Sequence, residues 1–314
     1  MIKTLEELPS FGQFIFYENE YDKFEGINAF HKAFWKSDDS IDDIVSDLIY
    51  EYEGTNSIRN TNLKEDYKNV MTVVISNIIR LLTSKKEYIR ISLSSNNYKG
   101  VNRIEKYEPI KITYTVFNNI ITWLAEADYI TLYKGEANPI IKLGSLVQPL
   151  DKLIELCDGY NYTSIQLHAK YSFTQLKDED KNLIDFEETE EIIYRNEILK
   201  KYNKFLNNQQ IQINSKDISY PITLESKFNE KIGRNGRVYG GEWMTCKSEL
   251  RDTITINGEK TVELDFSNCA LRLAGHLNSI DIPVNKDLYA TNVQGIVRAF
   301  VKRIATRSFN IKAS

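Results

Sequence analysis

The dipeptide Asn257-Gly258 stands between two runs of alternating residues and constrains this chain more than any other feature. Thr253-Ile254-Thr255-Ile256 precedes it, and Thr261-Val262-Glu263-Leu264 follows it after two further residues. Asn-Gly in this setting predicts a β-hairpin, because both residues accept the positive φ of a type I′ turn. The second run continues to Phe266, and alternation places Asp265 on the face opposite its apolar residues. We therefore expect a strand that presents Asp265 near its end and turns directly into a helix.

The segment Asp265-Phe266-Ser267-Asn268-Cys269-Ala270-Leu271-Arg272 resembles the first palm motif of the A-family polymerases. This family includes DNA polymerase I and the phage-type single-subunit RNA polymerases. Upstream, Gly236-Arg237-Val238-Tyr239 resembles the family's Gly-Arg motif, although Gly233 stands where the family usually has Thr or Asp. Downstream, Arg298 and Lys302 resemble the pair on the fingers helix that binds the incoming triphosphate. The three motifs follow the family's order within residues 228–312.

The resemblance implies Mg²⁺-dependent nucleotidyl transfer. Asp265 would be the catalytic carboxylate and a Mg²⁺ ligand, with the Phe266 carbonyl as a further metal ligand. Arg298 and Lys302 would bind the nucleoside triphosphate and offset charge on the leaving pyrophosphate, since residues four apart share a helix face. Ala270 stands where DNA-making members carry a bulky Glu, so the resemblance also implies tolerance of ribonucleotides.

The chain departs from the family at the second metal-binding acid, which the family supplies from a His-Asp pair. His31, His168 and His276 are the only histidines, and none precedes an Asp. On the fingers helix, Asn310 stands where the family has a Tyr, and the sequence ends at Ser314. Two explanations remain: a fragment of a longer polymerase-like protein, which we favour, or a degenerate relative that kept the palm strand for another purpose.

Each motif also has a purely structural interpretation. Asp265 at the end of a hairpin strand is typical of a turn or helix N-cap residue. Glu263 is a second candidate ligand on the same face, but it is more typical of a solvated strand position. The basic helix that carries Arg298 and Lys302 is equally typical of a solvated surface helix.

Arg237 and Arg234 flank the dipeptide Asn235-Gly236. The resemblance implies that Arg237 contacts the primer–template backbone, and Arg234 is a further candidate for binding the nucleic acid. Without the resemblance, the segment predicts only a turn.

The middle of the chain resembles the winged helix-turn-helix domains of replication initiators and transcription regulators. A helix predicted over 113–126 has apolar residues at a 3.6-residue period, and 129–133 and 140–143 predict the two strands of a wing. The resemblance implies that the start of the helix enters the major groove of DNA. The residues expected nearest to DNA are Lys111, Thr113, Thr115, Asn118 and Asn119. The helix carries no Arg, and winged helices also bind proteins.

We predict an α+β fold in which a helical N-terminal region with a winged helix precedes a partial polymerase-like palm. The predicted regions are an acidic helical region (1–65), a winged-helix-like domain (66–150), a helical linker region (151–226) and a partial palm- and fingers-like domain (227–314). Further expected elements are a helix near 70–82, a strand near 88–93 and an amphipathic helix near 190–206.

The net charge of −4 is distributed unevenly. Residues 1–54 hold 13 acidic and four basic residues, so the remainder is mildly basic, as expected of a chain that handles nucleic acid. No segment is long and apolar enough to span a membrane, and the N-terminus lacks a signal-peptide pattern. Cys157, Cys246 and Cys269 have no metal-ligand spacing. We expect a cytoplasmic protein with no membrane partner.

The leading hypothesis is a nucleic-acid-binding nucleotidyltransferase or polymerase-like protein of a phage or mobile element, with DNA or RNA and nucleoside triphosphates as partners. The alternative is a non-catalytic winged-helix DNA-binding protein of replication or regulation, whose palm-like unit is a relic or a dimerisation platform. A third interpretation is a mixed α and β domain without a nucleic-acid role. A second carboxylate close to Asp265 would separate the first two, and the nearest along the chain are Glu263, Asp281 and Asp287.

Overall fold

The computed structural model has an α+β fold, as predicted, and divides into two compact units, residues 1–260 and 261–314. It describes residues 1–8, 27–37, 39–58, 61–84, 86–98, 103–135, 144–218, 221–233, 236–264, 267–290, 293 and 296–308. In these ranges no helix combines the length and apolar character that crossing a membrane requires. The predicted boundary at residue 65 falls inside the helix Thr61–Thr83.

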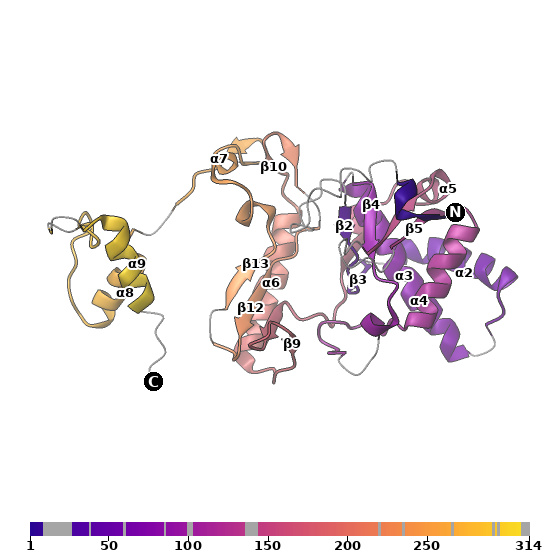
Figure 1. Cartoon of the computed structure of the whole chain (residues 1–314), viewed down its shortest axis with the longest axis horizontal. Helices are drawn as coiled ribbons and strands as arrows, with labels where there is room; N and C mark the ends of the chain where they lie inside the picture. The colour runs from indigo at the N-terminus through magenta and orange to yellow at the C-terminus, as the bar shows by residue number, and fades with distance from the viewer. Residues whose placement is uncertain are drawn as a thin grey trace. The chain divides into compact units, whose positions relative to one another are not determined.

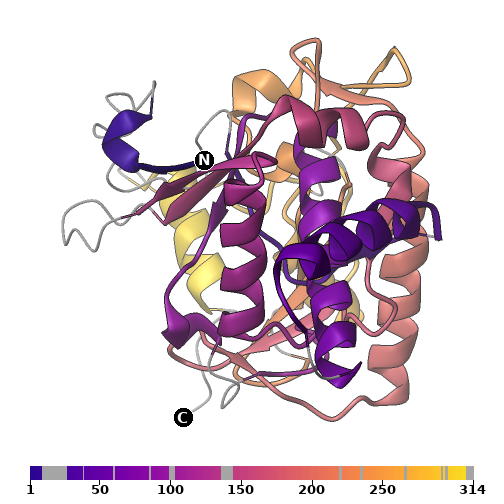
Figure 2. The same ribbon diagram turned by 90° about the vertical axis from the view of Figure 1, so that its right-hand side faces the viewer.

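The first unit has a helical core of α2 (Asp42–Thr55), α3 (Thr61–Thr83) and α4 (Tyr114–Glu126). Every residue from 70 to 79 of α3 is buried, which is typical of a central helix with neighbours on all sides. Figure 2 looks onto this layer and shows α2 lying across α3. The helix predicted near 70–82 is thus confirmed as part of α3.

A five-stranded sheet packs against these helices. Its strands are β1 (Ile2–Thr4), β2 (Ile27–Ala29), β4 (Tyr88–Ile91), β5 (Ile130–Lys134) and β6 (Ser145–Pro149), in the order β1-β5-β6-β4-β2. The three central strands are antiparallel, and each edge strand is parallel to its neighbour. The first predicted wing strand corresponds to β5. The second, 140–143, lies outside the described residues, and the strand that pairs with β5 is β6.

A second sheet has the order β13-β12-β8-β9, formed by β8 (Thr174–Lys177), β9 (Leu183–Ile184), β12 (Glu225–Asn229) and β13 (Arg237–Tyr239). The central strands β8 and β12 are parallel, so they need a long crossover, which contains α6 (Glu190–Asn207). This helix confirms the one predicted near 190–206 and runs along the sheet (Figure 1). Region 151–226, expected to be helical, therefore also holds several strands.

Two asparagines of α6 bind the backbone that leads into β12. Asn203 donates to the Leu224 carbonyl at 3.0 Å and accepts from the Leu224 amide at 2.6 Å. One turn later, Asn207 makes the same pair of bonds to Ile222, at 2.9 and 2.6 Å. The carboxamides thus satisfy buried backbone groups that have no sheet partner there.

The remaining elements of this unit are short. They include the pair β3 (Phe34–Lys36) and β7 (Ile165–Leu167), the helices α5 (Asp151–Leu156) and α7 (Ser248–Arg251), and a sheet with the order β11-β10-β14-β15 (Lys216–Asp217, Ile211–Ile213, Thr255–Ile256 and Glu259–Lys260). The hairpin β14-β15 is confirmed: Thr255 pairs with Lys260, and Asn257 and Gly258 have φ values of 53° and 83°.

The second strand predicted for this hairpin, 261–266, is wrong over its described part, because β14 pairs with β15 instead. Residues 261–264 have no regular structure, and Val262 and Leu264 are 80% and 89% exposed. The sheet ends at β15, so the alternating residues that follow have no packed face to join. The helix expected next does form, as α8 (Cys269–Leu277).

The second unit contains α8 and α9 (Arg298–Ser308). The Arg272 guanidinium donates to the backbone carbonyls of Ser267 (3.0 Å), Pro283 (3.1 Å), Val284 (2.6 Å) and Lys286 (2.9 Å). One side chain of α8 therefore organises both the start of its own helix and the loop that follows it.

Candidate functional site

The strongest candidate site is the face of the sheet β13-β12-β8-β9 that lies opposite α6. Two residues of β12 are buried on the side that faces α6. They are Ser226, whose hydroxyl accepts from Arg195 of α6 at 3.3 Å, and Phe228, whose ring also contacts Arg195. Strand alternation therefore turns Lys227 to the other face. The sheet register places Gln175 and Arg237 beside Lys227, and Lys177 beside Asn229.

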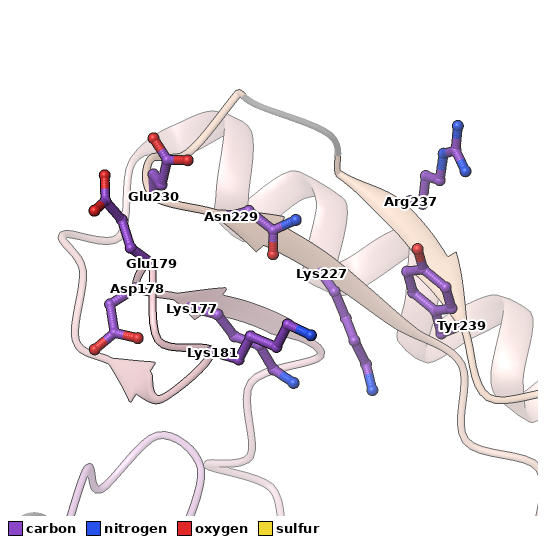
Figure 3. Close-up of a pocket in the computed structure, with 9 residues that line it drawn as sticks. All are labelled: Lys177, Asp178, Glu179, Lys181, Lys227, Asn229, Glu230, Arg237 and Tyr239. Atoms are coloured by element: carbon purple, nitrogen blue, oxygen red, sulfur yellow. The ribbon is translucent and has the colours of Figure 1, made fainter.

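This face of the sheet carries a groove with a volume of about 610 Å³. The lining residues are Lys177, Asp178, Glu179, Lys181, Lys227, Asn229, Glu230, Arg237 and Tyr239. A volume of this size lies within the range of ordinary ligand-binding pockets. Figure 3 shows the side chains of Lys177, Lys181 and Lys227 extending in the same direction, with the Arg237 guanidinium directed away from them at the rim.

The positive charge of the groove is only partly compensated. Lys227 lies 3.4 Å from Glu225 and 5.7 Å from the centre of the Tyr239 ring. Among the residues that the structure describes, Lys177, Lys181 and Arg237 form no ion pair. Lys227 and Arg237 are also direct cross-strand partners, and such like-charged pairs destabilise a sheet. The sheet therefore holds cations together at a cost to its own stability.

Three carboxylates occupy the opposite end of the groove, where β8 turns towards β9 (Figure 3). Asp178 is engaged in that turn, because it accepts from the Asn182 amide at 2.7 Å and from the Asn182 side chain at 3.2 Å. Glu179 is exposed, and Glu230 follows β12 with a positive φ of 64°. The groove thus has a cationic part, formed by the side chains of Lys177, Lys181 and Lys227, and an acidic part at its other end.

Two buried tyrosines, Tyr107 and Tyr171, hydrogen-bond to strands of this sheet. Tyr171 hydrogen-bonds to Glu225, and Tyr107 accepts from the Leu176 amide at 2.9 Å. Burial raises the pKa of Tyr107 to about 12 and also raises the pKa of Tyr171. Both phenols therefore stay protonated near neutral pH, and their role in the sheet is hydrogen bonding.

The residues expected to contact DNA surround the start of α4, but they differ in exposure. Lys111 and Thr115 are exposed and Asn118 is half-buried. Thr113 is the N-cap, where its hydroxyl accepts from the Val116 amide at 3.4 Å. Asn119 donates to the Tyr67 hydroxyl of α3 at 2.8 Å, so its side chain serves the helical core.

The residues expected to bind a triphosphate lie in the second unit. Arg298 is the first residue of α9, and its Nε donates to Asp287 at 2.5 Å. This hydrogen bond holds the pKa of Asp287 below its usual value. Lys302 is exposed one turn later, and Ala270 is half-buried in α8. A phosphate group would have to compete with Asp287 for Arg298.

The predicted metal ligands Asp265 and Phe266, and also Arg234, lie outside the described residues. Where the structure is described, no three acidic, histidine or cysteine side chains gather as a metal site would require. Asp287 is bound by Arg298 and by the Tyr289 amide, so it is not a free carboxylate for a metal pair. The metal site at Asp265 and Phe266 stays a prediction, and we assign no step to Mg²⁺.

The predicted residues are thus divided, with Arg237 in the first unit and Ala270, Arg298 and Lys302 in the second. Sequence reasoning missed Lys177, Lys181 and Lys227. Residues 177 and 227 are 50 positions apart, and only the parallel pairing of β8 with β12 brings them together. No protein-family model, curated protein or solved structure matches this chain, so no relative supplies a role for these residues.

Proposed function

We propose that this chain is a nucleic-acid-binding protein that contacts the phosphate backbone through the groove of the sheet β13-β12-β8-β9. The gathering of Lys177, Lys181 and Lys227 on one sheet face carries this proposal. Ammonium groups held close together by the pairing of β8 with β12 and by the turn after β8 suit a ligand with regularly spaced negative charges, and nucleic-acid backbones have this property.

The arrangement around α4 supports a second contact of the winged-helix type. Helix α4 is followed at once by the antiparallel pair β5 and β6, and Lys111 and Thr115 are exposed beside its first turn. A helix end of this kind enters the major groove in winged-helix proteins. Both contacts favour the alternative hypothesis, a non-catalytic protein of replication or regulation.

The test is the salt dependence of oligonucleotide binding, measured by fluorescence anisotropy. Each phosphate contact on a single strand adds about 0.7 to the slope of log affinity against log salt. The triple variant Lys177→Gln/Lys181→Gln/Lys227→Gln should lower that slope by about 2. Between about 50 and 200 mM salt, the wild-type protein should therefore lose about twentyfold more affinity than the variant.

Two controls sharpen the experiment. Lys200→Gln/Lys201→Gln/Lys204→Gln removes the same charge from exposed positions of α6 and should leave the slope unchanged. Glu179→Gln removes an exposed carboxylate from the acidic end of the groove and should strengthen binding at low salt. An equal loss of slope in both triple variants would refute the groove as the binding site.

A second candidate function is nucleotidyl transfer by the second unit, with Mg²⁺ as the proposed cofactor. It is favoured by the location of Arg298 and Lys302, one turn apart on α9, in the same compact unit as the helix that follows Asp265. The test is nucleotide incorporation on a primed template with Mg²⁺. Incorporation that disappears in Asp265→Asn would support this function, whereas incorporation that survives would remove Asp265 from the site.

A further inference from the structure

We infer that the groove accepts single-stranded nucleic acid, with one base stacked on Tyr239 and the adjoining phosphates on Lys227, Lys177 and Lys181. This inference rests on the proposed function and specifies its ligand. Single-strand sites generally combine a cationic groove with an aromatic side chain on which a base stacks.

Tyr239 occupies the position that such a platform needs. It ends β13, pairs with Glu225 across the sheet, and is 44% exposed. Lys227 lies on the same face, 5.7 Å from the centre of the Tyr239 ring. A base on the ring would therefore place its phosphate close to a cation that already belongs to the groove.

The backbone holds Tyr239 in place. Gly240 follows it with a φ of 126°, and a Cβ at position 240 would lie 1.9 Å from the Thr223 carbonyl oxygen. Thr223 lies between Ile222 and Leu224, whose backbone groups are bound by the α6 asparagines. The backbone at Gly240 thus packs closely against residues 222–224, which the α6 asparagines hold in place. Little main-chain freedom is therefore lost when a base stacks on Tyr239.

The acidic end of the groove favours one strand over two. Asp178, Glu179 and Glu230 lie beside the lysines, so a second phosphate backbone laid across the groove would meet carboxylates. In a duplex, moreover, the bases are stacked on each other and offer no free ring face to Tyr239. A single strand can follow the lysines, including Lys181 in the turn between β8 and β9, without laying a second phosphate backbone across the carboxylates.

The experiment compares three labelled ligands of about 12 nucleotides: an oligothymidine, the same length of abasic strand, and a duplex. Tyr239→Leu should weaken oligothymidine binding by about tenfold to a hundredfold, the usual effect of losing one stacked base. It should leave the abasic strand and the duplex within about twofold, because their phosphate contacts remain. Tyr239→Phe keeps the ring and should restore oligothymidine binding, which excludes a folding defect.

The outcomes separate this inference from the proposed function. Equal losses on the oligothymidine and the abasic strand, or tighter binding of the duplex than of the single strand, would overturn the single-strand inference. The proposed function would then still stand if the lysine triple variant showed the lowered slope of log affinity against log salt. Absence of binding to all three ligands would overturn both.

Discussion

The contact between Asn203 and Leu224 gives a quantitative prediction about what holds the groove's sheet in place. Asn203 is 5% exposed and Leu224 is 1% exposed, so Asn203→Ala leaves a backbone N–H and a C=O buried without partners. Each such group costs about 1–3 kcal/mol. We expect the free energy of unfolding to fall by about 2–6 kcal/mol.

Asn207→Ala is the matched control. It removes the same pair of hydrogen bonds, to Ile222, from the same helix, but Asn207 is only half-buried. Water can replace part of what is lost, so we expect a cost of about 1 kcal/mol. Both substitutions gain similar helix propensity, because both replace Asn by Ala within α6. The difference between the two variants in the free energy of unfolding therefore measures the effect of burying the hydrogen-bonded groups.

Differential scanning calorimetry would measure both variants. At about 2 °C or less per kcal/mol for a chain of this size, Asn203→Ala should lower the Tm of the first unit by several degrees, and Asn207→Ala by about 2 °C or less. Equal shifts for the two variants would refute the argument from buried backbone groups. A larger Tm shift for Asn207→Ala than for Asn203→Ala would also contradict this argument.

Two further predictions concern His31 and Arg272. Burial, aided by the charge of Arg80, lowers the pKa of His31 from 6.5 to about 4, so the unfolded chain binds a proton first as the pH falls. The free energy of unfolding, measured by urea titration, should have its full value above about pH 6.5 and fall by at most about 3 kcal/mol towards pH 4. His31→Gln should flatten this pH profile. Arg272→Met should speed amide hydrogen exchange at residues 284–286 by about tenfold or more. Arg272→Lys should recover only part of the protection, because an ammonium group cannot span four carbonyls. Unchanged exchange would show that the loop holds its conformation without the guanidinium.

Local patterns predicted the elements whose formation depends on nearby residues. The Asn257-Gly258 hairpin forms because its turn needs only two residues that accept positive φ. Helices α4 and α6 form where apolar residues recur at a helical period, although Ile198 and Tyr202, two of the apolar residues of α6, are about half exposed. The period indicates a helix more reliably than it indicates which side is covered.

Features that depend on distant partners were not predicted. Alternation over 261–264 indicates an extended chain but not whether another strand lies beside it, and these residues join no sheet. Asn203 and Asn207 resemble ordinary polar residues of a surface helix until the path of residues 222–224 is known. The lysine cluster likewise depends on the pairing of β8 with β12. Arg237, which its motif predicted as a nucleic-acid contact, also lines the groove, and that role stays a prediction.

The position of Arg237 also bears on self-association. β13 is an edge strand, and Arg237 is its exposed first residue. Sheet edges attract the edges of other molecules, and a charged side chain is a common protection against such pairing. Variants that neutralise Arg237 in a binding study should therefore be checked for aggregation, because a charged side chain on an edge strand disfavours pairing with a second chain.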